Sequence, residues 1–383
     1  MKKLLTVVIV FVIFLKVAPA IGVENNITIT KTDSLKLEHC EAKFKSGDYL
    51  GAIEILDKII LAEPKNTEAY MLRGMCRSEL GDYEGGMEDF NVVLILDHTH
   101  YKAYVKRGIA RSQLGDHRGA IEDFSKALVH NPKEIEALNN RAQERYLISD
   151  YSGAIKDYTS IIDLQQGNTF EVYYKRGIAR NEFGRYKEAI ADFSKAIELY
   201  PKYNYAYFYR GFAKNHINDF AGAIEDYTKV IELDPKDKIS YYNRAFSKRN
   251  LKDYQGAVAD YQKAIELDPQ YEEAYYELAH TKYQMGEIDA AIKDFDALIE
   301  QFPNDIGAYF NRGSFYMEIE KFEEALTDFN KVIEMNANDK EAYYYRAIVK
   351  SNLGKSSEAC EDIKKAQELG EKKAADLRKK ICR

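Results

Sequence analysis

Nearly the same stretch of sequence occurs twice in this chain. VKRGIARSQLGDHRGAIEDFSKALVHNPK begins at Val105, and YKRGIARNEFGRYKEAIADFSKAIELYPK begins 69 residues later, at Tyr174. Because 69 is 34 plus 35, a third copy is expected between them, and Ala137 begins it with ALNNRAQERYLISDYSGAIKDYTSII. A period of about 20 to 50 residues is typical of repeat folds. The sequence therefore predicts an array of stacked copies of one small unit.

The same register extends over most of the chain. It gives ten repeats over residues 33–373, with one extra residue near Asn168. The repeats begin at Asp33, Thr67, Tyr101, Ile135, Phe170, Asn204, Lys238, Glu272, Ile306 and Lys340. Residues 374–383 keep apolar side chains at i, i+3 and i+7, at Ala374, Leu377 and Ile381. This spacing predicts a final amphipathic helix that caps the array.

Each repeat contains two helical patterns. In the fifth repeat, Tyr173 and Gly177 lie on one face of a first helix, and Ala189 and Phe193 on one face of a second. Gly184 lies between them and can end the first helix in a left-handed conformation. Small residues let the two helices approach, and the aromatic rings fill the space around them. A single hairpin cannot bury these faces, but stacked hairpins can.

This pattern resembles a known family. Helix pairs with aromatic and small residues at these offsets, repeated every 34 residues, resemble the tetratricopeptide repeat, and the resemblance covers about 90% of the chain. Closing prolines recur at Pro64, Pro132, Pro201, Pro235, Pro269 and Pro303. The resemblance implies an all-α fold, a right-handed α-solenoid of antiparallel helix pairs. The first helices would line its concave groove.

Two charged positions depart from the plainest family pattern. Position 7 of a repeat, often leucine in the family, is arginine in eight repeats, and position 23 is then aspartate. The pairs are Arg73 and Asp89, Arg107 and Asp123, Arg141 and Asp157, Arg176 and Asp192, Arg210 and Asp226, Arg244 and Asp260, Arg312 and Asp328, and Arg346 and Asp362. A buried charge requires a partner, so we expect a structural ladder of Arg–Asp pairs rather than a ligand site. In the eighth repeat Leu278 replaces the arginine, so Asp294 needs another cation, for which Lys282 is the candidate.

The sequence offers little for catalysis or cofactors. Gly354-Lys355-Ser356 lacks the earlier glycine of a phosphate-binding loop and reads as a turn between helices. His98 and His100 could supply two metal ligands, but the spacing implies no third. The net charge of −7 disfavours nucleic acid as a partner. We therefore expect a protein that is not an enzyme and that uses no cofactor and no metal.

Four cysteines lie near the two ends of the array. Cys40 and Cys76 fall in the first helices of repeats one and two, and Cys360 and Cys382 fall in the last repeat and the terminal helix. In an oxidising compartment they could form the bridges Cys40–Cys76 and Cys360–Cys382. The alternative is that they are small buried apolar residues.

Residues 1–20 resemble an export signal. Lys2 and Lys3 precede an apolar run, Leu4 to Leu15, and Ala18 and Ala20 supply the small residues of a cleavage site. The alternative is an uncleaved membrane anchor. Residues 21–32 would then be a linker. We expect an exported protein, periplasmic or extracellular, which contacts a membrane only if this segment is retained.

The family resemblance also places a candidate binding surface. Positions 2, 5, 9 and 12 should face the groove, and in repeats five to ten many are aromatic. This aromatic track comprises Tyr174, Tyr205, Phe208, Phe212, Tyr242, Phe246, Tyr276, Phe310 and Tyr344. Aromatic side chains suit an extended peptide or a partner helix. The leading hypothesis is a scaffold that binds another protein or peptide. The alternatives are a carbohydrate or cell-envelope binding module, and a tyrosine stripe that only reflects repeat duplication.

Overall fold

The computed structural model describes residues 32–164 and 169–382, and in these residues all regular structure is helical. Residue contacts divide the chain into two compact parts, Met1–Ala110 (the N-terminal part) and Arg111–Arg383 (the C-terminal part), with the division inside one helix. The expected signal in residues 1–20, residues 21–31 of the expected linker 21–32 and the extra residue near Asn168 lie outside the described residues, and Thr32, the last residue of that linker, begins the first helix.

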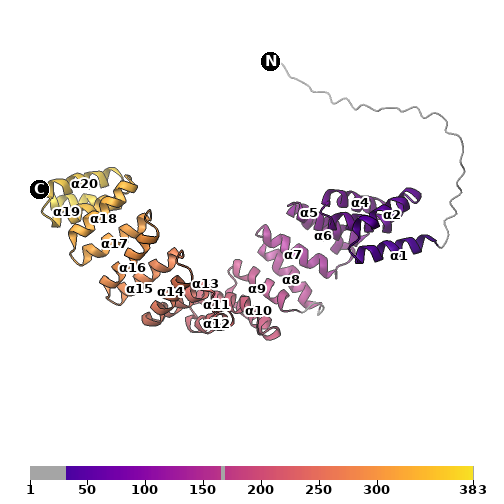
Figure 1. The fold of residues 1–383 in the computed structure, drawn as a ribbon, viewed down its shortest axis with the longest axis horizontal. Coiled ribbons are helices and arrows are strands. Elements are labelled where there is room, and N and C mark those ends of the chain that lie inside the picture. The colour runs from indigo at the N-terminus through magenta and orange to yellow at the C-terminus, as the bar shows by residue number, and fades with distance from the viewer. Residues whose placement is uncertain (1–31, 165–168, 383) are drawn as a thin grey trace, which may run out of the picture. The chain divides into compact units, whose positions relative to one another are not determined.

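The N-terminal part contains two helical hairpins and most of a following helix (Figure 1). Its helices are α1 (Thr32–Lys45), α2 (Tyr49–Ala62), α3 (Thr67–Glu79), α4 (Tyr83–Leu96) and the first residues of α5 (Tyr101–Gln113). Helix α2 packs against both α1 and α3, so the two hairpins form one stack.

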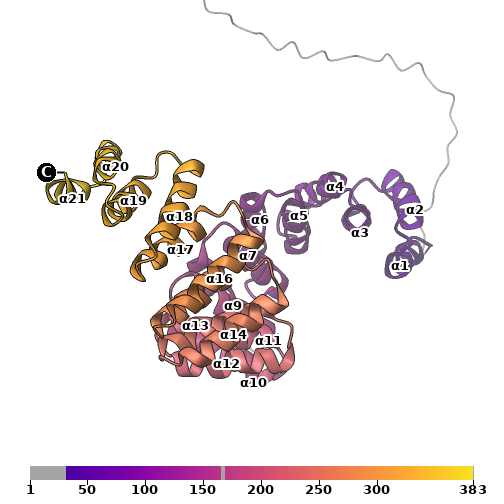
Figure 2. The same ribbon diagram turned by 60° about the vertical axis from the view of Figure 1, so that its left-hand side comes forward.

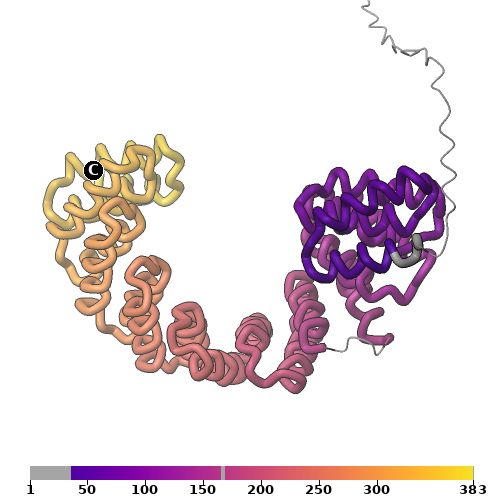
Figure 3. Tube along the Cα trace, turned by 45° about the vertical axis from the view of Figure 1, so that its right-hand side comes forward, coloured from indigo at the N-terminus to yellow at the C-terminus, as the bar shows by residue number. Residues whose placement is uncertain are grey.

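The C-terminal part continues the same series of hairpins, with helices of 13 or 14 residues up to α20 and an eight-residue helix at the end. After the end of α5 come α6 (His117–His130), α7 (Ile135–Leu147), α8 (Tyr151–Asp163), α9 (Phe170–Glu182), α10 (Tyr186–Leu199), α11 (Asn204–His216), α12 (Phe220–Leu233), α13 (Lys238–Asn250), α14 (Tyr254–Leu267), α15 (Glu272–Gln284), α16 (Ile288–Gln301), α17 (Ile306–Glu318), α18 (Phe322–Met335), α19 (Lys340–Asn352), α20 (Ser356–Glu368) and α21 (Ala374–Ile381). Within this part each helix from α6 to α20 packs against the next in sequence, and Figures 2 and 3 show the successive hairpins from two further directions. The chain is an α-solenoid, as expected.

Short capped turns join the two helices of a hairpin. In α12 the N-cap residue Asp219 accepts a hydrogen bond from the Gly222 amide at 3.1 Å, a pattern that recurs in several second helices. Gly184 has φ +74°, which confirms that it ends α9 in a left-handed conformation. At the same turn, four repeats place a residue with a side chain in this conformation: Ser149, Asn218, Lys252 and Glu320.

Close helix approach explains the small residues of each repeat. A Cβ on Gly177 would lie 2.7 Å from Cε1 of Phe193, closer than real side chains pack. Ala189 and Phe193 are fully buried in the same hairpin. Burial of such a ring contributes roughly 2–3 kcal/mol, so the aromatic residue at position 24 anchors the interior of the hairpins in repeats two to nine, and Leu56 and Ile363 take its place in the first and tenth.

Helix α21 covers the last hairpin. It packs against α20, where Ala374 is buried and Leu377 and Ile381 are half-buried in one apolar cluster. The amphipathic spacing of residues 374–383 therefore has the expected role of a cap. Among the described residues, no helix is long and apolar enough to cross a membrane.

Candidate functional site

The arginine and aspartate positions form a ladder inside the array. In seven of the predicted pairs the arginine and the aspartate belong to the same compact part of the chain, and all seven ion pairs are formed. Their Nη2–Oδ1 distances run from 2.6 to 2.7 Å, in the pairs Arg73–Asp89, Arg141–Asp157, Arg176–Asp192, Arg210–Asp226, Arg244–Asp260, Arg312–Asp328 and Arg346–Asp362. The arginine Nε donates a second bond to the same carboxylate, so the contact is bidentate.

A second cation meets most of these carboxylates. It comes from position 11 of the repeat, one helical turn after the arginine: Arg180 Nη1 lies 2.6 Å from Asp192 Oδ2, and Lys214 Nζ lies 2.9 Å from Asp226 Oδ2. In the eighth repeat Lys282 Nζ lies 2.7 Å from Asp294 Oδ1, which confirms the expected partner. Burial nevertheless raises the pKa of the Asp294 carboxyl, because one lysine offsets only part of the desolvation.

The position-7 arginine also joins neighbouring repeats. Arg176 Nη1 donates to Thr159 Oγ1 on α8 at 3.1 Å, while its other nitrogens hold Asp192 on α10. The same link to the preceding repeat recurs from Arg73 to Asp57, Arg107 to Asn91, Arg141 to Ser125, Arg210 to Ser194, Arg244 to Thr228, Arg312 to Asp296 and Arg346 to Asn330. These charges therefore hold neighbouring repeats together.

The residues of the aromatic track differ in exposure. Tyr205 and Phe212 are 56% and 38% exposed, and the other seven are half-buried. Most position-5 rings lie against the position-24 ring of their own repeat, with centroid distances of 5.6–6.0 Å in the pairs Tyr174–Phe193, Phe208–Tyr227, Tyr242–Tyr261, Tyr276–Phe295 and Phe310–Phe329. Packing thus accounts for much of their recurrence. A role for the track in binding stays a prediction.

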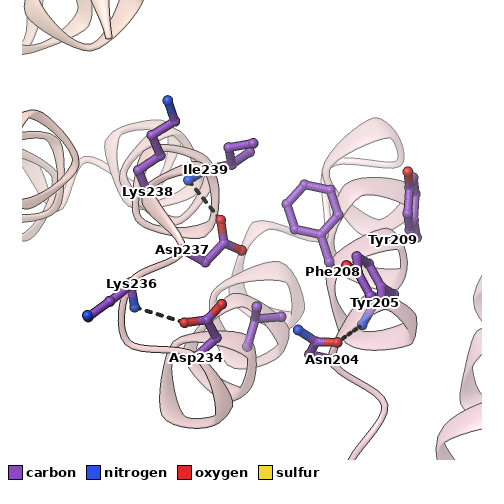
Figure 4. Close-up of a pocket in the computed structure, with 10 residues that line it drawn as sticks. Asn204, Tyr205, Phe208, Tyr209, Asp234, Lys236, Asp237, Lys238 and Ile239 are labelled. Atoms are coloured by element: carbon purple, nitrogen blue, oxygen red, sulfur yellow. Dashed lines mark hydrogen bonds between the residues drawn. The ribbon is translucent and has the colours of Figure 1, made fainter. Parts of the chain in front are cut away.

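One stretch of the track opens into a cavity. The cavity has a volume of about 490 Å³ and lies between α11, the end of α12 and the start of α13; we call it the α11–α13 pocket (Figure 4). Two residues of the predicted track, Tyr205 and Phe208, form part of its wall. The complete lining is Asn204, Tyr205, Phe208, Tyr209, Val230, Asp234, Lys236, Asp237, Lys238 and Ile239.

Sequence reasoning missed several residues near this surface. Tyr209 is at position 6, and Asp237 and its counterparts Tyr203 and Tyr271 are at position 34, whereas only positions 2, 5, 9 and 12 were considered. Tyr203 lies 5.0 Å from the Tyr174 ring, measured between centroids. The signal that could have found position 34 is its alternation between tyrosine and aspartate in repeats five to eight.

The cysteines behave differently at the two ends. Cys360 on α20 and Cys382 just after α21 form a disulfide, one of the two bridges considered from the sequence. The other bridge is not formed, because Cys40 and Cys76 are free thiols in this structure. Both are fully buried in one apolar cluster, and burial raises the pKa of the Cys76 thiol to about 11. They therefore follow the alternative expectation of small buried apolar residues.

The histidine and glycine motifs that the sequence singled out have roles in helix ends and turns. His100 Nδ1 accepts a hydrogen bond from the Ala103 amide at 3.1 Å, so this side chain caps the start of α5. Gly354 has φ +74° in the turn between α19 and α20, as in the other repeats. In residues 32–164 and 169–382, no group of three or more His, Cys, Asp or Glu side chains is placed to hold a metal ion.

Comparisons with known proteins agree with the fold. Family models described as tetratricopeptide repeat match residues 37–98, 170–203, 205–237 and 276–340, and one described as TPR repeat matches 247–286. The search of curated proteins found no match.

Among solved structures, the C-terminal part of a TPR repeat-containing protein from Cytophaga hutchinsonii is 21% identical, with a TM-score of 0.55 over 63% of this chain and 99% of that one. A chain of the Naa15/Naa10 complex bound to HypK-THB is 13% identical, with a TM-score of 0.50 over 91% of this chain and 66% of that one. At these identities the likeness concerns the fold alone. The repeat register, the stacked hairpins and the family matches together show that this chain belongs to the tetratricopeptide repeat family.

Proposed function

We propose that this chain is an exported, non-enzymatic scaffold that binds another protein or peptide along the first helices of repeats five to ten. Tetratricopeptide repeats typically serve protein–protein interaction, which supports the general class. The observation that carries the specific site is the α11–α13 pocket, where Tyr205 and Phe208 of the aromatic track line a cavity instead of only filling the core.

The surroundings of the track favour binding. Phe208 is held between Tyr209 and Tyr227, with ring centroids 5.3 and 5.7 Å away, so little side-chain freedom remains to be lost. Rigid aromatic side chains give large contact area at low entropic cost. The buried charges on the same helices are engaged in the Arg–Asp ladder, which leaves them a structural role rather than a catalytic one.

The proposal of export rests on residues 1–20 of the sequence. Its test is the intact mass of the protein recovered from cells that make it. Cleavage after Ala20 supports export, whereas full-length protein that remains with the cytoplasmic fraction contradicts it.

The binding proposal is tested by crosslinking capture in the same cells. The wild type is compared with Phe208→Ala/Tyr242→Ala/Phe246→Ala and with Tyr205→Ala/Phe212→Ala, which removes only exposed rings. The exposed pair Leu61→Ala/Ile95→Ala in the N-terminal part is the matched control for lost apolar surface. We expect both track variants to lose a specific crosslinked band that the control retains. An unchanged band pattern in both track variants contradicts the proposal.

A further inference from the structure

We infer that the α11–α13 pocket binds the guanidinium group of an arginine, so that the partner is a peptide segment with an exposed arginine side chain. This inference rests on the proposed function and specifies the chemistry of the partner. It follows from the two walls of the pocket, one aromatic and one bearing carboxylates, and from a comparison with the same place in neighbouring repeats.

The first wall is aromatic. Tyr205, Phe208 and Tyr209 of α11 line the pocket, and Figure 4 shows their rings on one side of it. Tyr205 is 56% exposed, so its ring is accessible to a ligand. The face of an aromatic ring carries partial negative charge and attracts cations, and a planar guanidinium also stacks on it.

The second wall carries two carboxylates. Figure 4 shows Asp234 and Asp237 across the pocket from Phe208. Each is held in place by hydrogen bonds: Asp234 Oδ1 accepts from the Lys236 amide at 3.1 Å, and Asp237 accepts from the Ile239 amide at 3.0 Å and from Ser240 Oγ at 2.7 Å. A carboxylate oxygen has two lone pairs, so oxygens that already accept one bond can accept another from a bound arginine.

The two lysines of the lining do not neutralise these carboxylates. In Figure 4 the side chains of Lys236 and Lys238 extend away from the rings. The Lys238 ammonium forms an ion pair with Asp268 at the end of α14. The space between the walls is therefore bordered by negative charge and by aromatic rings, a combination that favours a cation and disfavours a carboxylate.

Neighbouring repeats show why the pocket is open here. At the start of α11 and of α15 the residue equivalent to Asp237 is a tyrosine, and its ring packs on the position-5 ring: Tyr203 on Tyr174 at 5.0 Å and Tyr271 on Tyr242 at 5.1 Å. At the start of α17 the equivalent residue is again an aspartate, Asp305.

Asp305 already has a hydrogen-bond donor within its own repeat, because the Tyr276 hydroxyl donates to Asp305 Oδ2 at 2.7 Å. In the sixth repeat, position 5 is Phe208, which has no hydroxyl to donate to Asp237. In the sixth repeat a phenylalanine and an aspartate thus leave both a space and an accessible carboxylate. The same pair recurs in the ninth repeat as Phe310 and Asp339, but there the Tyr345 ring packs on Phe310 at 5.5 Å. A guanidinium supplies the planar donors that the sixth repeat lacks.

The test uses two immobilised nonapeptide libraries with four randomised residues on each side of a central residue. The central residue is arginine in one library and citrulline, which has nearly the same shape without the charge, in the other. The amount of purified wild-type chain retained by each library is measured at equal salt. We expect about tenfold more retention by the arginine library, the size of effect given by one charge-assisted contact.

Two variants connect this preference to the pocket. Asp234→Asn/Asp237→Asn removes the two charges with little change of shape, and Asp237→Tyr introduces the residue that closes the same place in neighbouring repeats. Glu198→Gln/Glu232→Gln removes two exposed charges from α10 and α12 and is the matched control. We expect both pocket variants to reduce the arginine preference to about twofold or less, while the control keeps it near tenfold.

Equal retention by the two libraries, or equal loss in the control variant, overturns the inference. Circular dichroism of each variant establishes that its helices are intact. If the library preference is absent but the track variants still lose their crosslinked band, only the arginine inference fails. If the preference depends on Asp234 and Asp237 while capture in cells is unaffected by the track variants, the proposed function fails instead.

Discussion

Arg176 and Asp192 face each other inside one hairpin, with Nη2 2.6 Å from Oδ1 and Nε 2.9 Å from Oδ2. Asp192 also holds Arg180, and all three side chains are largely shielded from water. We expect Asp192→Ala to lower the free energy of unfolding by about 3–5 kcal/mol, because it leaves two cations in a buried seam without their carboxylate. Urea unfolding followed by circular dichroism measures the loss.

The exposed pair Lys195 and Glu198 on the same helix is the control for this variant. Exposed ion pairs contribute about 0–1 kcal/mol, so Glu198→Ala should change stability by less than 1 kcal/mol. Similar losses for the two variants would show that the ladder stabilises no more than surface charge does.

The stability of the eighth repeat should depend on pH through the buried Asp294 carboxyl. Burial raises the pKa of the Asp294 carboxyl, so the folded state binds protons more readily than the unfolded state. The charged form therefore reduces stability at neutral pH, and this penalty is relieved as the pH falls through the raised pKa toward the ordinary aspartate value of about 3.9. The stability of Asp294→Asn relative to the wild type should decrease over that range, by at most about 1.4 kcal/mol per pH unit.

Urea midpoints of the wild type and Asp294→Asn between pH 7 and pH 4 test this expectation. Glu300→Gln, an exposed change on the same helix α16, controls for the general effect of removing a carboxylate. A difference between Asp294→Asn and the wild type that is constant with pH would contradict it.

The turn after α13 stores backbone strain. Lys252 has φ +65°, a left-handed conformation that costs a residue with a side chain about 1 kcal/mol relative to glycine. Lys252→Gly should therefore raise the free energy of unfolding by about 0.5–1 kcal/mol. The reciprocal change, Gly184→Lys, should lower the free energy of unfolding by a similar amount. A Cβ at this position meets no other atom within 4 Å, so the only cost is that of the left-handed backbone conformation. Changes of the same sign in the two variants would contradict this account.

The disulfide should stabilise the C-terminal cap. Cys360–Cys382 joins residues separated by 22 positions and ties the end of α21 to α20. In the chain-entropy description, a cross-link that closes a loop of this size lowers the entropy of the unfolded chain and so raises the free energy of unfolding by about 3 kcal/mol. We expect Cys360→Ser/Cys382→Ser to increase amide hydrogen exchange in α21 while leaving α9 to α12 unchanged. Reductant should reproduce the effect in the wild type and have none in the variant.

Counting the reactive thiols tests which cysteines form the disulfide. Unfolded wild-type protein without reductant should show two reactive thiols, Cys40 and Cys76, and four after reduction. In the folded protein the two should label slowly, because they are buried and the pKa of Cys76 is about 11, which keeps the thiolate scarce. Rapid labelling of the folded protein would contradict their position in the core.

Much of the fold can be predicted from the sequence, because every repeat of the 34-residue period forms the same helical hairpin. The spacing of small and aromatic residues fixes each hairpin, and the covariation of Arg176 with Asp192 across the repeats identifies the ladder. The recurring cation at position 11, such as Lys214, was visible in the sequence but was considered only for Lys282, where the arginine was missing.

The pocket could not be predicted in the same way. It depends on whether the side chain at position 34 of one repeat fills the space beside position 5, as Tyr271 does beside Tyr242, or leaves it open, as Asp237 does beside Phe208. A period describes what the repeats share, whereas a pocket arises where two neighbouring repeats differ. The choice between bridged and free cysteines likewise depends on distances that spacing along the chain does not give.

The arginine link between repeats has a mechanical consequence. A tensile load along the C-terminal part passes from hairpin to hairpin through bonds such as Arg176 to Thr159 and Arg210 to Ser194. Leu278 occupies the corresponding place in the eighth repeat, and a leucine side chain can donate no such bond. At this junction the ion pair between Arg249 on α13 and Glu277 on α15 joins the two repeats instead. A stretching load therefore crosses from the seventh to the eighth repeat through a contact between two side chains that are partly exposed, which salt screens more than the buried ladder.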